Sequence, residues 1–453
     1  MKRTVRSLST LLLFFVISCL TLTSCNQKKV DTLRICFDVG TNEDTSQGAS
    51  FQQSAAKGFV DAVSTAAQLN GRELCDIEIE VIPSDKRQAS ERESMLQRIR
   101  TEIMTGNGPD VFICATEGSE LARLSSSRLF PYLAKSIEDD IFLPLDDYMS
   151  KFQLVSMDEL SAPILSGGKN SSGQQAVVPI CYSIPCFVWE AVGTAPDIEG
   201  EQVRWLWPIG SFSVESMRMD SHSTGLSYIY PDLFNYKEKK ISMSEDELTM
   251  LIKDSIPELK TLMDSETEDI SWALLMSRML NSGIFPSRDN GPESTDLSIL
   301  PLRNQADGVT ATVSMYCAVN ADTTFPDDAA FVLEYLLSKT CQDSSGIFSI
   351  NNSFSAPTLL INRTARQDHD TVLTQATIEN LNLAHEEVNR VYFPSPADTD
   401  LNQMFEDIKE KMRDGFASDA PKYEFIKGDI SDAALEEIVH EYYGKISRLL
   451  EES

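Results

Sequence analysis

The chain has 453 residues, of which 42% are hydrophobic, and a formal net charge of −30 at pH 7. This length exceeds one ordinary hydrophobic core, so we expect two domains or two lobes. So acidic a chain repels phosphate backbones, which argues against nucleic-acid binding, and the same charge also promotes solubility.

The N-terminal segment has the pattern of a secretory signal. Three basic residues precede an apolar run, Leu8–Leu22, which is short for a membrane-spanning helix of about 20 apolar residues. The run ends in Leu22-Thr23-Ser24-Cys25, which resembles a bacterial lipobox. The resemblance implies a signal peptide over 1–24, a lipid on Cys25 and a tether over 25–31. An ordinary signal with a chance cysteine is the alternative.

Strands and helices alternate in the next part of the chain. Apolar residues alternate or recur at helical spacing, which predicts strands at 33–37, 77–82 and 111–115 and helices at 50–68 and 87–105. This order is typical of a parallel α/β sheet.

The remaining elements are spaced more widely. Short strands are predicted at 177–180 and 313–319, and 297–301 reads as an extended crossing segment. A capping box at Ser244 and Glu247 opens a helix. Further helices are predicted at 270–280 and 327–338, and two C-terminal helices carry apolar residues from 401 to 412 and from 435 to 449.

The cysteines favour no disulfide framework or metal site. Without Cys19 in the signal and Cys25, the count is odd, and most thiols lie in apolar strand-like runs, which is typical of small buried residues. These are Cys36, Cys75, Cys114, Cys181, Cys186, Cys317 and Cys341.

Motifs of common enzymes are missing from the sequence. We find no phosphate-binding loop, no His-Glu-x-x-His pair and no Gly-x-Ser-x-Gly turn. We therefore predict no catalytic residue, no metal and no cofactor. The paired carboxylates of a glycosidase leave no fixed spacing, so a secreted glycan-active enzyme stays open as an alternative.

One stretch carries a family resemblance. Thr101–Phe112 reads as a helix end, a Gly-Asn-Gly-Pro-Asp turn and a strand. It resembles a recurring stretch in the family of extracellular solute-binding proteins of carbohydrate ABC transporters. Weaker similarities follow in the family's order at 129–133, 143–148, 173–179, 235–251 and 300–302.

The resemblance implies a two-lobed α/β fold like that of periplasmic binding proteins. Each lobe would be a mainly parallel sheet flanked by helices, and a hinge would join the lobes. Lobe I would comprise 32–178 and 302–341. Lobe II would comprise 179–301 and 342–453, with the C-terminal helices.

The same resemblance implies a function and partners. The chain would capture a small solute, a sugar or an oligosaccharide, in the cleft between the lobes and deliver it to an ABC permease. It would act as a monomer, anchored by its lipid to the extracytoplasmic side of the cell membrane.

Ligand contacts in this family come from loops after particular strands and from aromatic residues of the second lobe, because sugar rings stack on flat side chains. The matching positions here are Asn42, Glu43, Thr116, Glu117, Tyr182, Trp189 and Trp272. Core tryptophans and a solvated loop are the simpler interpretation of several of these.

The sequence departs from the family in its second lobe. Val188-Trp189 stands where a Tyr-Asn pair is usual, and no Gly-Lys-Ala-Ala-like strand is found around Gly283–Arg288. A surface lipoprotein with a degenerate cleft, serving as a sensor or structural module, therefore stays open as a second alternative.

Overall fold

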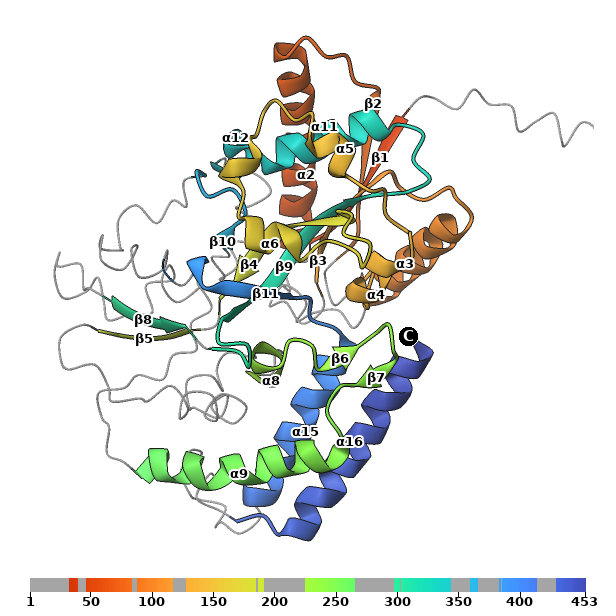
Figure 1. Ribbon diagram of the computed structural model, residues 1–453. Coiled ribbons are helices and arrows are strands. Elements are labelled where there is room, and N and C mark those ends of the chain that lie inside the picture. The colour runs from red at the N-terminus through yellow and green to blue at the C-terminus, as the bar shows by residue number, and fades with distance from the viewer. Residues whose placement is uncertain are drawn as a thin grey trace, which may run out of the picture.

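A computed structural model describes residues 32–39, 46–83, 88–116, 128–184, 186–190, 225–264, 297–301, 303–343, 359–365, 383, 385–413 and 429–453 (Figure 1). The predicted signal segment, Cys25 and the predicted helix at 270–280 lie outside these residues.

A seven-stranded mixed sheet forms the first body. Its order is β10-β4-β9-β3-β1-β2, and β11 also pairs with β9. Pairing is parallel for β1 with β2, β1 with β3 and β11 with β9, and antiparallel where β9 meets β3 and β4 and where β4 meets β10. The strands are β1 (Thr32–Asp38), β2 (Asp76–Val81), β3 (Val111–Ala115), β4 (Val177–Ser183), β9 (Val309–Val319), β10 (Leu359–Leu360) and β11 (Val388–Tyr392).

Helices cover this sheet and complete two apolar clusters. α2 (Ser46–Leu69) and α11 (Pro326–Leu337) contribute to one cluster, which contains alternate residues of β1, β3 and β9. α3 (Ala89–Met104) and α4 (Leu133–Glu138) contribute to the other. Shorter helices are α5 (Asp146–Met149), the 3₁₀ turn η3 (Met157–Glu159), α6 (Ala162–Ser166) and α12 (Lys339–Asp343).

A second body has its own apolar core and is largely helical among the described residues. α9 (Glu245–Asp264), α15 (Pro396–Arg413) and α16 (Asp432–Glu452) pack together with α8 (Gly225–Ile229) and the short hairpin of β6 (Phe234–Asn235) and β7 (Lys240–Ile241). Figure 1 shows α9, α15 and α16 at the opposite end of the molecule from α2 and α11. A separate antiparallel ribbon joins β5 (Cys186–Glu190) to β8 (Leu297–Pro301).

The predicted burial of the thiols is largely confirmed. Cys36, Cys114, Cys181, Cys317 and Cys341 are buried, whereas Cys75 is half-buried. The side chain of Cys186 is outside the described set. Most of these thiols therefore pack as small core residues.

Gly106 ends α3 in the left-handed region, with φ of +70°. A Cβ there would meet the Asp322 carboxylate at ordinary contact distances of 3.4 and 3.7 Å. The cost of a side chain at this position therefore comes from the backbone conformation. We expect Gly106→Ala to lower the free energy of unfolding by about 1 kcal/mol in urea denaturation. The control is Gly58→Ala inside α2, where a Cβ meets nothing within 4 Å. That change should stabilise the protein or leave it unaltered; equal losses in both variants would refute this account.

Candidate functional site

Asp38 ends β1 and lies at the centre of a buried ionic cluster. Its carboxylate accepts hydrogen bonds from Arg92 Nη1 at 2.8 Å and Arg92 Nη2 at 3.1 Å, and Arg128 Nη1 lies at 3.5 Å. All three side chains are buried. Burial alone would raise the pKa of Asp38, but the two guanidinium groups hold that pKa below its usual value.

This cluster fixes segments that are distant in the sequence. Arg92 belongs to α3, Arg128 precedes α4, and the backbone N–H of Leu129 lies 3.4 Å from the Asp38 carboxylate. Arg92 Nη1 also donates to the carbonyl of Pro83 after β2. One carboxylate thus organises the carboxyl end of β1, where ligands of open α/β sheets are commonly bound.

Thr116 follows β3 at the same edge of the sheet. It is buried, its Oγ1 donates to the carbonyl of Val313 at 2.7 Å, and its N–H donates to the carbonyl of Ser314 at 3.0 Å. Three other predicted contacts, Asn42, Glu43 and Glu117, lie outside the described residues. The prediction that they bind a ligand stays a prediction.

Tyr182, in β4, is fully buried in this conformation. Its hydroxyl lies 2.7 Å from His385 Nδ1, and the two rings pack edge to face at 5.6 Å. Burial raises the pKa of Tyr182 and lowers the pKa of His385 to about 4, the latter with help from the positive charge of Arg363. The pair joins β4 to the segment that enters β11. Ligand contact by Tyr182 stays a prediction.

The remaining predicted site residues are not brought together by the described structure. Trp189 lies in β5 and pairs with Ser298 of β8, but its side chain is outside the described set. Trp272 and Cys25 lie wholly outside it. Of the seven predicted contacts, the structure thus places the side chains of Thr116 and Tyr182 alone.

The segment after β11 contains a buried carboxylate that the sequence analysis missed. Asp398 in α15 accepts hydrogen bonds from Tyr392 Oη at 2.6 Å, Ser227 Oγ at 2.6 Å and Ser395 N–H at 2.8 Å. Burial raises the pKa of Asp398 above its usual value although these donors lower it. Tyr392 belongs to the sheet and Ser227 to α8, so this group joins the two bodies.

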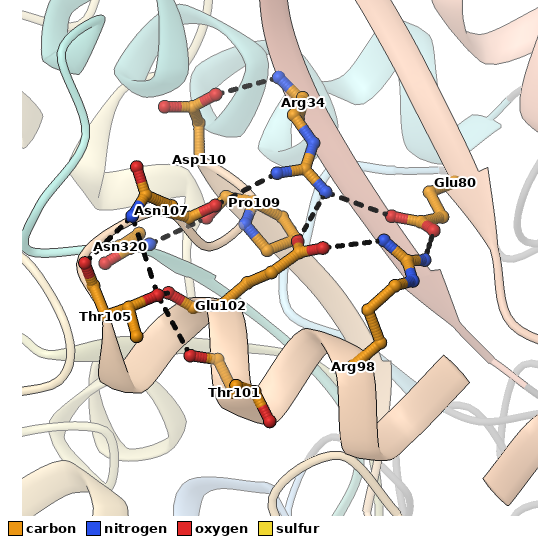
Figure 2. Close-up of polar contacts among 10 residues, drawn as sticks. All are labelled: Arg34, Glu80, Arg98, Thr101, Glu102, Thr105, Asn107, Pro109, Asp110 and Asn320. Carbon is orange, nitrogen blue, oxygen red and sulfur yellow. Dashed lines mark hydrogen bonds and ion pairs between the residues drawn. The ribbon is translucent and has the colours of Figure 1, made fainter. Parts of the chain in front are cut away.

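The Gly-Asn-Gly-Pro-Asp turn, which carried the family resemblance, is structural. Asp110 Oδ2 accepts from the Arg34 N–H at 2.8 Å (Figure 2). Its Oδ1 accepts from Thr323 Oγ1 at 2.6 Å. Asn320 Nδ2 donates to the carbonyl of Pro109 at 2.9 Å. These bonds fasten the start of β3 to β1 and to the end of β9.

The Arg34 side chain extends this fastening to α3. Its Nη1 donates to the Asn107 carbonyl at 3.0 Å, and its Nη2 pairs with Glu102 at 2.7 Å and Glu80 at 3.3 Å (Figure 2). Arg98 adds ion pairs to the same two carboxylates. The turn therefore lies away from Asp38, the last residue of β1, and from Thr116, which follows the other end of β3.

A signal for the ionic cluster was present in the sequence. Arg92 precedes the buried Leu96 by four residues and Ile99 by seven, which places it on the apolar face of the helix. An arginine at such a position needs a buried partner. The partner, Asp38, ends an apolar strand but gives no local indication of its contact with α3.

The described residues offer neither a metal site nor a membrane-spanning helix. No group of three or more His, Cys, Asp or Glu side chains there could hold a metal ion. No helix in the described ranges is both long and apolar enough to span a bilayer.

No family model matches the chain, and no curated protein matches it in sequence. Solved structures do match its fold. The bacterial solute receptor AcbH, described as having an exclusive preference for β-D-galactopyranose, has a TM-score of 0.53 at 11% identity, with 92% of this chain and 98% of that chain covered. A de novo designed cysteine esterase, ECH19, has a TM-score of 0.52 at 13% identity, with 93% and 98% covered.

A periplasmic oligogalacturonide-binding protein from Yersinia enterocolitica is a more distant match, with a TM-score of 0.47 at 12% identity and with 93% of this chain and 99% of that chain covered. At such identities the similarity shows the fold alone, and a receptor and an esterase both share it. The predicted fold class is confirmed: the chain is an α/β protein with the architecture of solute-binding proteins.

Proposed function

We propose that this chain is an extracellular solute-binding protein that captures a sugar or oligosaccharide between its two bodies and delivers it to an ABC permease. A lipid on Cys25 would hold it, as a monomer, on the extracytoplasmic side of the cell membrane. The observation that carries the proposal is the fold, which matches that of a galactopyranose receptor over 92% of the chain.

Features of the described structure support this proposal. Buried polar groups gather where strands of the first body end, around Asp38 and Thr116, and a second polar group at Asp398 joins the bodies. A two-body protein can shift between open and closed forms when a solute binds between the bodies. Because β10 and β11 pair within the first sheet, we also propose that lobe I includes residues 359–365 and 388–392.

Thermal-shift measurements on the full-length protein in detergent test the proposal. The panel is D-galactose, D-glucose, maltose, mannotriose and digalacturonate. A solute present at a hundred times its Kd stabilises the folded state by about 2.7 kcal/mol, which corresponds to a rise in Tm of roughly 5 °C. We expect one solute to give such a rise and to be recovered unchanged.

Two results would contradict the proposal, and each favours a different alternative. Hydrolysis of a panel sugar would indicate a glycan-active enzyme. Unchanged melting across the panel, with no heat of binding in calorimetry, would indicate a degenerate binding-protein fold that acts as a sensor or structural module.

A further inference from the structure

Three strands end at the middle of β9. The register places Ser183, at the end of β4, and Tyr392, at the end of β11, opposite Thr312. Thr116, directly after β3, bonds to the carbonyls of the next two residues, Val313 and Ser314. A point where neighbouring strands end and their chains diverge is where open α/β sheets bind ligands.

Hydroxyl groups gather at this junction. Thr116, Ser183, Thr312, Ser314 and Tyr392 all carry one. Thr116 is 1% exposed, Thr312 4% and Ser183 6%. A strand of a buried sheet is more often lined by apolar side chains, so this concentration of hydroxyls calls for polar partners.

Two of these hydroxyls lack a partner. Among the residues that the structure describes, Thr312 Oγ1 and Ser314 Oγ are buried and accept or donate no hydrogen bond. A buried hydroxyl without a partner destabilises a protein, because it loses its bonds to water. A protein can retain such a destabilising hydroxyl when the hydroxyl forms a hydrogen bond to a bound molecule.

The backbone at Ser314 is also irregular. Val313 pairs with Tyr182 and Met315 pairs with Cys181, so Ser314 is skipped in the pairing with β4. Bulges of this kind re-aim a side chain and are over-represented beside binding and active sites. The irregularity therefore falls on one of the two unpartnered hydroxyls, which is an observation independent of their burial.

We propose that Thr312 and Ser314 are solute-contacting residues that bind hydroxyl groups of a neutral sugar. This inference rests on the proposed function and specifies its solute class. Serine and threonine hydroxyls both donate and accept, as the hydroxyls of a sugar do. The buried charged groups of this region are already bound: Asp398 accepts from Tyr392 and Ser227, and Asp38 is paired with Arg92 and Arg128. The junction therefore offers free hydroxyls and no unpaired charge among the residues that the structure describes.

Isosteric substitutions test this proposal in the full-length protein. Thr312→Val and Ser314→Ala delete one hydroxyl each and keep the shape of the core. Calorimetric titrations use D-galactose, D-glucose and maltose, and digalacturonate serves as the charged comparison. We expect about a tenfold weaker Kd for the neutral sugar in each variant, since each loses a buried hydrogen bond to solute. Without solute, both variants should melt at the wild-type temperature or above it.

Thr65→Val and Ser94→Ala are the matched controls, because both hydroxyls are exposed on helices and bond to the preceding turn. They should bind solute like the wild type. Wild-type affinity in Thr312→Val and Ser314→Ala would overturn this inference alone. A lower Tm of these variants without solute would also overturn it, because it would show that the hydroxyls are already bonded to internal water. Binding of digalacturonate alone would overturn the neutral-sugar class. A wild-type protein that binds none of the panel would overturn the proposed function as well.

Discussion

Replacement of Asp38 by Ala should lower the free energy of unfolding by about 3–5 kcal/mol, because it leaves two guanidinium groups buried without their carboxylate. Arg92 is 3% exposed and Arg128 1% exposed, so neither can turn to water without moving α3 or the segment before α4. Urea denaturation at pH 7 measures this loss. It would be among the largest effects of a single substitution in this protein.

The matched control for Asp38 is Asp139→Ala, which breaks an exposed pair with Lys135 at 3.7 Å. We expect the control to unfold at the wild-type urea concentration, since exposed pairs contribute little. A loss in Asp38→Ala no larger than in the control would show that the buried cluster is not stabilising. Because the pKa of Asp38 is lowered, its contribution is complete above the unfolded-state pKa and is lost as pH falls through the folded-state pKa.

A second large effect should come from His385 in mild acid. Its pKa is lowered to about 4, so the folded protein binds this proton less readily than the unfolded chain, whose histidine titrates near 6.5. The contribution is complete above pH 6.5 and is lost as pH falls from 6.5 to 4. The loss amounts to about 3 kcal/mol.

His385→Gln isolates this effect, since glutamine does not titrate and can still bond to Tyr182. The difference in unfolding free energy between pH 7 and pH 4.5, followed by urea denaturation, should shrink by about 2 kcal/mol in the variant. His440→Gln is the control, because the His440 side chain is 77% exposed. If the acid sensitivity follows His440, or persists undiminished in His385→Gln, the burial of His385 does not govern it.

The sequence predicted the first body well because local patterns determine its elements. The strand expected at 111–115 is β3 as observed, and the helix expected at 87–105 is α3 within two residues at each end. The C-terminal helices were also found, since their apolar faces recur at helical spacing over long stretches. β9 was predicted from residue 313 and begins at Val309, because Thr310 and Thr312 obscure its apolar run.

The candidate site was harder to predict, because it depends on contacts between distant segments. Thr116 was anticipated through its place after a strand, but Thr312 and Ser314 were not. Their significance depends on the ends of β3, β4 and β11 meeting β9, which joins residues as far apart as Thr116 and Val313, 197 positions. The contact of Asp38 with Arg92 and Arg128 likewise arises only once α3 and the segment before α4 are packed.

The position of β9 in the chain has a consequence for how the protein is made. β9 joins the trio β1, β2 and β3 to β4 and β10, yet it begins at residue 309. During synthesis, more than a hundred residues must be added after β4 before β9, the strand that pairs with both β3 and β4, has been made. Their unpaired edges are prone to aggregation in that interval, and sheets completed by distant segments fold slowly. Folding of this chain therefore requires that its first half be kept from premature association until β9 has been made.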